Sequence, residues 1–289
     1  GGKTSSYIAV NYPADYNVFA LVRTDDKSCI FPDAKIRQIV SDKIGTEFIG
    51  TLEEDSIIYT MLDLEQLIGK KIDWVTGVTF DDLIKLKNNE IETQKYYAQV
   101  LPTKLRRYCT SEMKMIPILE WLKKNINEIV EMRIGFRANE MNRAKATLAK
   151  TNEFGILSER TVIGKSKNGN RNKWGEIFWQ KPVFPLIEDA IFKDHIENFW
   201  KDKSVRFAYM NNCVGCFHRD PILLKYMSNK FPNKFDWFVN AEKNRKHKFD
   251  TWKESGRLTY QNIKDHKFKQ SVMFNDEDFN DCDSGYCGL

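Results

Sequence analysis

Residues 17–44 read NVFALVRTDDKSCIFPDAKIRQIVSDKI, and they contain one apolar strand pattern followed by one helix pattern, the alternation that decides the fold. The apolar run at 17–23 predicts a buried strand, and the apolar spacing within 33–44 predicts a helix. The alternation continues along the chain, with further helices predicted at 56–68, 79–88 and 111–127 and strands at 72–76 and 128–134. Such alternation predicts an α/β fold with an open, mostly parallel sheet and helices on both faces.

The chain changes character near residue 185. Before that point, residues 164–175 (GKSKNGNRNKWG) are polar and rich in Gly and Asn, which predicts an exposed loop or hairpin tip. Beyond it, helical patterns predominate at 190–203, 220–230 and 233–246. We therefore expect an α/β domain over residues 1–185 and a helical, cysteine-bearing region over residues 186–289.

Composition limits the class of protein. The formal net charge is +5, and 42% of the residues are hydrophobic. The apolar runs are short and interrupted by charge, so none approaches the roughly 20 residues that span a bilayer, and no secretory signal is visible. We expect a soluble, cytoplasmic protein with no membrane partner. In such a protein the Cys213-x-x-Cys216 pair indicates metal binding or redox chemistry, whereas Cys29 is expected to be structural.

The opening residues form a candidate phosphate loop. They are Gly1, Gly2, Lys3, Thr4, Ser5 and Ser6, followed by an apolar helical stretch. Glycines let backbone N–H groups approach an anion, and the N-terminus of the following helix adds its dipole. Lys3, Ser5 and Ser6 add a positive charge and hydroxyl donors. A simple helix cap is the alternative interpretation.

Three further stretches carry residues suited to phosphate or metal binding. They are RRYCTSEMKMIPI with Arg107, Cys109 and Lys114, MRIGFRANEMNR with Arg137 and Glu140, and NNCVGCFHRDP with Cys213 and Cys216. Arg137 could clamp a phosphate through two hydrogen bonds, and an ion pair with Glu140 is compatible with that role. Two sulfurs two residues apart can bind one metal ion or one edge of a cluster.

Together and in this order, the four stretches resemble the motifs of the phosphoadenosine phosphosulfate (PAPS) reductase-like family. This family belongs to the ATP pyrophosphatases, also called PP-loop or adenine-nucleotide α-hydrolase-like enzymes, and the resemblance runs from Gly1 to about residue 220. The family loop reads Ser-Gly-Gly-x-Asp-Ser, so the leading Ser is absent here and Thr4 takes the Asp position. Because that loop follows the first strand of the family's sheet, the resemblance implies a strand upstream of Gly1.

The resemblance also implies roles for individual residues. Nucleotide binding is expected from Gly1–Ser6, Asp25, Arg107 and Arg137, although Asp25 could equally cap a turn. Catalytic charge stabilisation is expected from Lys3, Lys114 and Arg137. Cys109 is expected to join Cys213 and Cys216 as ligands of a cluster.

Cys282 and Cys287 lie in the terminal stretch CDSGYCGL. Cys287-Gly288-Leu289 resembles the core of the mobile C-terminal motif of sulfonucleotide reductases, in which the Cys attacks the substrate sulfur. Tyr286 replaces the Glu of that motif, and no His follows. Alternatively, one residue of this stretch is the fourth metal ligand. We expect Cys287 first in that role, Cys282 second, and His218, from the Cys213–Cys216 stretch, third. An acidic, disordered tail with incidental thiols is the third interpretation.

Three functions follow from these observations. The first is an enzyme that binds ATP, adenylates a substrate and transfers sulfur with a [4Fe–4S] cluster, zinc being less expected and Mg²⁺ a further candidate cofactor. Its candidate partners are a nucleic-acid sulfur acceptor and a cysteine desulfurase. The second is a sulfonucleotide (PAPS or APS) reductase that uses Cys287 and thioredoxin. The third is a non-catalytic nucleotide or nucleic-acid binding protein.

A basic segment at 242–269 bears on the nucleic-acid partner. It carries nine basic and four acidic residues, with four aromatic residues between them, namely Phe249, Trp252, Tyr260 and Phe268. Basic and aromatic residues interleaved in this way suit a single-strand groove. An amphipathic helix followed by a turn is the alternative, and it is the one we favour from the sequence.

Overall fold

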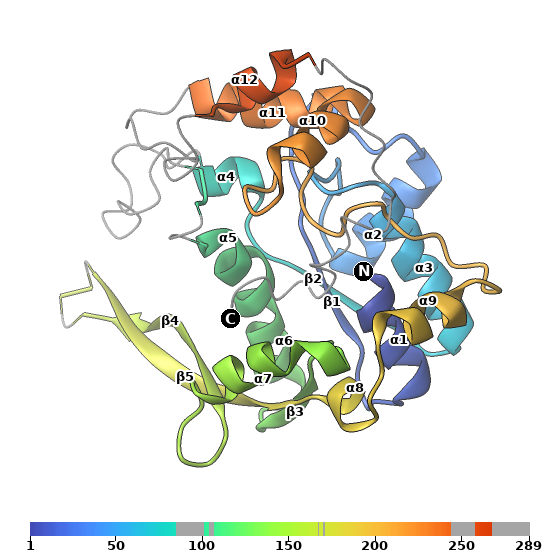
Figure 1. The fold of residues 1–289 in the computed structure, drawn as a ribbon. Helices are drawn as coiled ribbons and strands as arrows, with labels where there is room; N and C mark the ends of the chain where they lie inside the picture. Colours follow the sequence, from blue (N-terminus) through green and yellow to red (C-terminus); the bar gives the residue numbers. More distant parts are fainter. Residues whose placement is uncertain (85–100, 104–106, 167, 170, 244–257, 268–289) are drawn as a thin grey trace.

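The computed structural model describes residues 1–84, 101–103, 107–166, 168–169, 171–243 and 258–267 (Figure 1). Its strands lie in two sheets. In the first, β1 (Val18–Leu21) pairs in parallel with β2 (Asp73–Thr76). In the second, β5 (Asn172–Val183) lies between β3 (Val130–Arg133) and β4 (Leu157–Lys165). It is parallel to β3 and antiparallel to β4.

The α/β class predicted from the alternation is confirmed. One open sheet was expected, whereas the described strands divide between two sheets and the second is mixed. The mixed character arises because β4 and β5 are joined as a hairpin, which makes them antiparallel. The tip of this hairpin falls inside the polar segment 164–175, so the predicted hairpin tip is confirmed. Figure 1 shows the hairpin extending away from the rest of the molecule.

Local signals place several helix ends where the sequence predicts them. α2 (Ala34–Ile44) begins after Asp33, whose carboxylate accepts hydrogen bonds from two backbone amides of the first turn. α3 (Ser56–Ile68) ends at Gly69, which has a φ of 61° that favours glycine. The other helices in the first half are α1 (Lys3–Asn11), η1 (Lys27–Cys29), α4 (Phe80–Ile84), α5 (Tyr108–Thr110), η3 (Ser111–Met115) and α6 (Ile116–Asn125). Those in the second half are η4 (Ala138–Glu140), α7 (Met141–Leu148), α8 (Pro185–Glu188), α9 (Lys193–Trp200), α10 (Pro221–Lys230), α11 (Pro232–Lys243) and α12 (Tyr260–Asp265).

Two predicted helices differ from the structure in their details. The helix expected over 79–88 is observed as the short α4, and residues 85–88 lie outside the described ranges. The helix expected over 111–127 begins as the wider π-helical turn η3 and continues as α6. Such turns occur frequently at functional sites, and this one carries Lys114.

Two large apolar clusters form most of the core. One combines Val22 and Phe80 with Phe217 and Phe238, and the other combines helices α1 and α3 with α9. Each cluster therefore contains residues from both sides of position 185, so the two predicted regions share their cores. None of the described helices has the length and apolar character needed to cross a bilayer.

Candidate functional site

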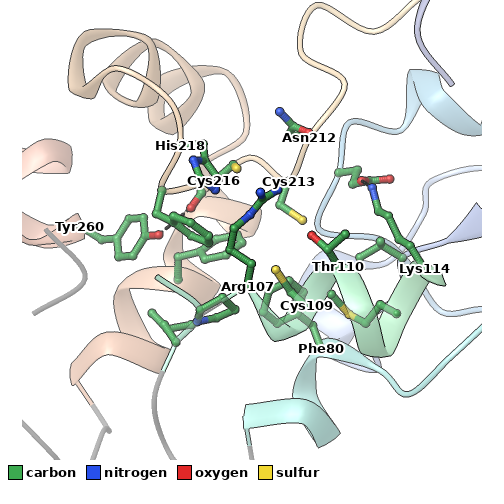
Figure 2. A pocket seen from close by; sticks show the side chains of 18 residues that line it. Phe80, Arg107, Cys109, Thr110, Lys114, Asn212, Cys213, Cys216, His218 and Tyr260 are labelled. Carbon is green, nitrogen blue, oxygen red and sulfur yellow. Dashed lines mark hydrogen bonds and ion pairs between the residues drawn. The ribbon is translucent and has the colours of Figure 1, made fainter. Parts of the chain in front are cut away.

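Three cysteines predicted to act together line one pocket. Cys109 lies in α5, and Cys213 and Cys216 lie in the loop before α10, yet all three border a cavity of about 60 Å³. This volume is several times the roughly 10–15 Å³ that one water molecule requires, so the pocket has room for a metal ion. Figure 2 shows the three thiols around this pocket, with Arg107 among them.

The thiols are held in their neutral form by their surroundings. Burial raises the pKa of Cys109 to about 11, and the pKa values of Cys213 and Cys216 are also raised, mainly by burial. A thiol whose pKa is far above 7 is a poor nucleophile, because the thiolate is the reactive form. The pocket as it stands is therefore unsuited to free-thiol catalysis, and a bound cation would be needed to make these groups thiolates.

Two cationic side chains border the same pocket. Burial lowers the pKa of Arg107 from its ordinary value, while the neighbouring Cys109 and Cys216 oppose that effect. Lys114 forms an ion pair with Glu53 at 3.1 Å, and the Glu53 side chain is only 4% exposed. Burial alone would lower the pKa of Lys114, but Glu53 and Cys213 raise it above its ordinary value. Lys114 is therefore a fixed positive charge beside the thiols.

Residues from distant parts of the chain hold the Cys213–Cys216 loop in place. The hydroxyl of Tyr260, from α12, donates a hydrogen bond of 2.6 Å to the carbonyl of Gly215. A Cβ atom on Gly215 would lie 2.4 Å from the buried ring of Phe238, so only glycine allows this close approach. The Tyr260 side chain is only 1% exposed, so this ring is not available to stack on a base, and its burial agrees with the amphipathic helix that we favoured from the sequence.

The predicted phosphate loop forms the start of α1. Gly2 precedes the helix in an extended conformation, and no side chain caps the helix. Ser5 Oγ donates to the Gly2 carbonyl at 3.0 Å, and the buried Ser6 hydroxyl has no hydrogen-bond partner among the described residues. A Cβ atom on Gly135 would lie 3.1 Å from the side chain of Thr4. The start of α1 is therefore next to the C-terminal end of β3, which is the edge where ligands bind in open α/β sheets.

A second, larger cavity adjoins this helix start. It has a volume of about 550 Å³, and among its lining residues are Lys3 of α1, Ser56 at the start of α3, and Lys230. Lys3 forms an ion pair with Glu197 of α9. The two cavities adjoin each other, because neighbouring residues line them. Glu53 lines the thiol pocket and Glu54 the larger cavity, and likewise Asn212 lines the thiol pocket and Asn211 the larger cavity.

Arg137 occupies a different position from the other predicted cations. It is 5% exposed, and its Nε donates to Glu140 Oε2 at 3.0 Å. Glu140 also accepts hydrogen bonds from the Arg137 amide and from Arg143. Arg137 is not among the residues that line either cavity. The ion pair with Glu140 that the sequence suggested is thus present, and the structure does not bring Arg137 together with Lys3 or Lys114.

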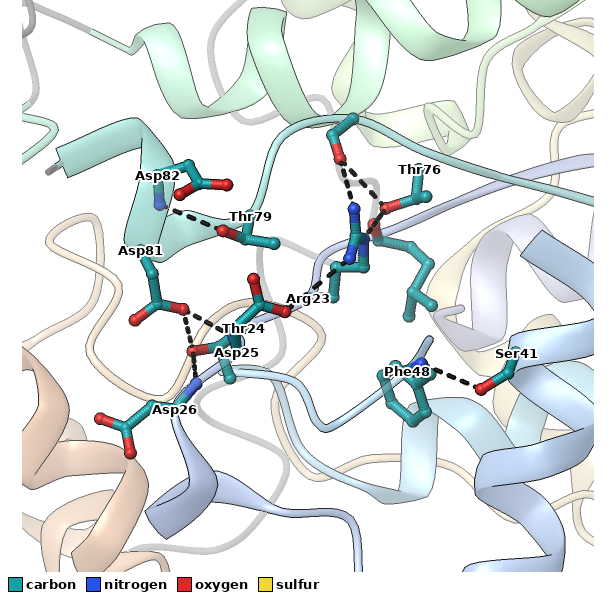
Figure 3. A network of polar contacts seen from close by, with 12 residues as sticks. Arg23, Thr24, Asp25, Asp26, Ser41, Phe48, Thr76, Thr79, Asp81 and Asp82 are labelled. Carbon is teal, nitrogen blue, oxygen red and sulfur yellow. Dashed lines mark hydrogen bonds and ion pairs between the residues drawn. The ribbon is translucent and has the colours of Figure 1, made fainter. Parts of the chain in front are cut away.

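Asp25 lies at the end of β1 in a separate polar network (Figure 3). Its amide donates to Asp81 Oδ2 at 2.8 Å, and its exposed carboxylate lies 3.8 Å from Arg23. Asp81 also accepts a hydrogen bond from the hydroxyl of Thr24. Asp25 lines neither cavity, so the structure does not bring it together with the other predicted nucleotide ligands.

The metal prediction is tested only in part by these positions. Within the described ranges, no group of three or more His, Cys, Asp and Glu side chains is arranged closely enough to hold a metal ion. The three thiols share a pocket but would have to turn toward one point to ligate a metal. His218 lines the same pocket, whereas Cys282 and Cys287 lie outside the described residues.

Several residues of the two cavities escaped the sequence analysis. Glu53 and Lys230 belong to stretches that read as ordinary surface charge. Lys230 lies near three aromatic rings, 5.0 Å from the ring centre of Tyr209, 5.8 Å from that of Tyr226 and 5.4 Å from that of Phe231. Phe231, the next residue, and Tyr226, four residues earlier, were the local sequence signal that could have identified Lys230.

Comparison with protein-family models, curated proteins and solved structures finds no match for this chain.

Proposed function

We propose that this chain is a PAPS reductase-like enzyme that binds ATP beside the start of α1 and adenylates a substrate for sulfur transfer. In this proposal the thiol pocket holds a [4Fe–4S] cluster. The observation that carries the proposal is the convergence of Cys109, Cys213 and Cys216 on one pocket beside two cations. Cys213 and Cys216 are close in the sequence and would share a pocket in any case. Cys109 is far from both in the sequence, so its place in the same pocket is a separate observation.

The donor set of the pocket fits a soft metal centre. Thiolates are the preferred ligands of iron–sulfur clusters and of zinc. Thiolate ligation places negative charge in a buried site, and Arg107 and Lys114 would offset that charge. Cys109, Cys213 and Cys216 would be three of the ligands, with Cys287, Cys282 or His218 as the fourth. The cluster would supply or activate sulfur when bound.

The larger cavity is suited to the nucleotide. Its volume of about 550 Å³ lies within the roughly 300–1,000 Å³ of small-molecule sites. Lys3 and Lys230 line it together with Glu54 and Asp55, and Lys230 lies 3.7 Å from Glu54, so a phosphate would bind by displacing carboxylates from these lysines. Helix α1 begins beside the cavity with backbone N–H groups that no side chain caps, which favours phosphate. Lys3 would stabilise the charge that develops as pyrophosphate leaves. The shared boundary at residues 53–54 and 211–212 would place the nucleotide beside the cluster.

Metal content is the direct test of this proposal. The chain is purified anaerobically, its visible absorption is recorded, and iron, sulfide and zinc are measured for the wild type and for Cys109→Ser, Cys213→Ser and Cys216→Ser. We expect iron and sulfide in the wild type and their loss in all three variants. Cys29→Ser is the control, because Cys29 is a buried free thiol that does not line the pocket and lies 3.8 Å from the Asn233 carbonyl. Equal metal content in all five proteins would overturn the cluster, and zinc alone would indicate a structural site.

Turnover separates the proposed reaction from its alternatives. We expect release of pyrophosphate from ATP in the presence of the sulfur acceptor, and its loss in Lys3→Ala. Release of sulfite from PAPS or APS with thioredoxin, abolished by Cys287→Ser, would instead identify a sulfonucleotide reductase. Tight binding of ATP without either product would identify a non-catalytic binding protein.

A further inference from the structure

The β4–β5 hairpin exposes one face that carries apolar and aromatic side chains. Val162 lies directly opposite Trp174, and Ser158 lies opposite Phe178. Residues two apart on a strand share a face, so Trp174 and Phe178 are on the same side of the hairpin. Their side chains are 36% and 44% exposed, and Val162 is 39% exposed. Large apolar side chains gathered on one exposed face indicate a binding surface.

The opposite face of the hairpin packs on the body of the protein. Ile177 packs in the apolar cluster around α6, and Glu159 accepts a hydrogen bond from Ser111 of η3. The hairpin is therefore anchored through the base of its inner face, whereas Ile163, farther out on that face, is 47% exposed. Its outer face, with Trp174 and Phe178, is exposed to solvent.

Positive charge is concentrated on the same hairpin. Residues 157–183 contain six basic and two acidic residues, a net charge of +4 in a chain whose total is +5. One of the two acids, Glu159, is engaged with Ser111 on the inner face. The other, Glu176, lies opposite Arg160 and accepts a hydrogen bond of 3.2 Å from Ser158. The exposed apolar face is thus surrounded by a positive field, which selects a polyanion over a neutral apolar partner.

We infer that the outer face of this hairpin binds single-stranded nucleic acid. Trp174 and Phe178 would stack on bases, and Arg160 and Lys165, which lie opposite Glu176 and Asn172 on the same face, would contact phosphates. Basic residues combined with exposed aromatic rings are the usual components of single-strand sites. The two rings are four residues apart on β5, which corresponds to about 14 Å along a strand. The base faces of a duplex are covered by stacked neighbours about 3.4 Å away, so only an unstacked single strand offers base faces to both rings.

This inference does not rest on the reaction proposed above. The hairpin lines neither of the two cavities. If the hairpin variants do not change nucleic-acid binding, this inference fails, but the metal content of the cysteine variants still tests the proposed cluster. If the cysteine variants keep the metal content of the wild type, the proposed cluster fails, but oligonucleotide binding still tests the hairpin.

The test measures the affinity of the purified chain for short fluorescein-labelled oligonucleotides by anisotropy, using single-stranded DNA, single-stranded RNA and a duplex of the same length. We expect single strands to bind more tightly than the duplex. Trp174→Ala and Phe178→Ala should each weaken binding by about 5-fold to 150-fold, the effect of losing one stacked base. Phe178→Tyr retains the aromatic face and should bind like the wild type. Phe192→Ala is the matched control, because Phe192 is 47% exposed at the start of α9.

A salt series tests the electrostatic part. Each lost phosphate contact lowers the slope of log affinity against log salt by about 0.7 for single strands, and we expect this change in Lys165→Ala, whose exposed side chain is on the outer face. Unchanged affinity in both aromatic variants, or preference for the duplex, would overturn the inference. Self-association of the wild type that Trp174→Ala abolishes, without oligonucleotide binding, would instead identify the face as a protein interface and overturn it equally.

Discussion

Replacing Asp81 with alanine should strongly destabilise the protein. Asp81 lies in the first turn of α4, is 4% exposed, and accepts three hydrogen bonds. Thr24 Oγ1 and the amide of Asp25 donate to its Oδ2 (Figure 3). The indole Nε1 of Trp237 in α11 donates to its Oδ1 at 2.8 Å. One carboxylate thereby joins the end of β1, the start of α4 and a helix of the C-terminal part.

The magnitude follows from the donors that the substitution leaves behind. Thr24 and Trp237 are 0% and 5% exposed, so each would keep a buried donor without its acceptor. Each such loss costs about 1–3 kcal/mol, and bonds to a charged acceptor lie at the upper end. The Asp25 amide is close enough to solvent to be hydrated. We therefore expect Asp81→Ala to lower the free energy of unfolding by about 4 kcal/mol, within a range of about 2–6.

Urea unfolding monitored by circular dichroism measures this loss. With a slope of about 3 kcal/mol per molar urea, the midpoint should fall by more than about 1 M. Asp82→Ala is the matched control, because Asp82 lies in the same helical turn with an exposed side chain. It should change the free energy of unfolding by about 0.5 kcal/mol or less. Asp81→Asn should fall between the two, since its amide retains one acceptor oxygen.

A double-mutant cycle with Trp237→Phe isolates the link between α4 and α11. If the indole bond accounts for part of the loss, the double variant is more stable than the sum of the single effects predicts, by about 1–2 kcal/mol. Equal destabilisation by Asp81→Ala and Asp82→Ala would refute the reasoning. Strict additivity in the cycle would refute the role given to Trp237.

Three further predictions concern the other polar groups and the thiol loop. Burial alone would raise the pKa of Glu140, but Arg137 and Arg143 lower it by more, so the pKa in the folded protein is below its ordinary value. The ionised carboxylate therefore stabilises the fold above its unfolded pKa of about 4.3, and this stabilisation is lost as the pH falls through the folded pKa. Glu140→Gln lacks this carboxylate, so its urea midpoint should fall less in acid than that of the wild type. Lys230→Ala should weaken ATP binding about tenfold by calorimetry, the effect of about 1.4 kcal/mol, whereas Lys71→Ala, with a side chain 77% exposed, should not. Gly215→Ala should lower the free energy of unfolding by about 1–3 kcal/mol through overpacking and reduce the metal content, while Gly164→Ala, whose added Cβ meets nothing within 4 Å, should do neither.

The elements that the sequence predicted correctly are those with local signals. The range 56–68 agrees with α3, because its apolar periodicity ends at Gly69 in a left-handed conformation. The strands β1 and β2 were recognisable as short apolar runs between helices. The π-helical turn at the start of 111–127 was missed, since apolar periodicity does not distinguish it from an α-helix. Division of the strands into two sheets depends on pairing between distant segments, which no local pattern encodes.

The thiol pocket was predictable only through the resemblance to a family. Nothing in the spacing of Cys109 and Cys213 requires that they meet, and the contact depends on packing of α5 against the loop before α10. Tyr260 illustrates the two readings left open for the basic segment. A nucleic-acid groove needs an exposed ring, whereas the favoured amphipathic helix allows a buried one, and the apolar contacts of α12 with α10 and α11 bury it. A tyrosine needs one hydrogen-bond partner when buried, and the Gly215 carbonyl provides it.

The positions of the cations change how the proposed chemistry must be divided. The sequence suggested that Lys3, Lys114 and Arg137 act on the same phosphate, yet Lys3 and Lys114 line different cavities and Arg137 lines neither. Lys114 is paired with Glu53 and lines the thiol pocket, so its charge would serve a thiolate-ligated centre better than a nucleotide. Lys3 and Lys230 line the larger cavity, where they form ion pairs with Glu197 and Glu54, so a phosphate bound there would have to compete with these carboxylates. Arg137 instead fixes the turn after β3 through Glu140, and that turn supports the start of α1. Its substitution should therefore weaken nucleotide binding only indirectly, by displacing the helix start that we propose as the phosphate site.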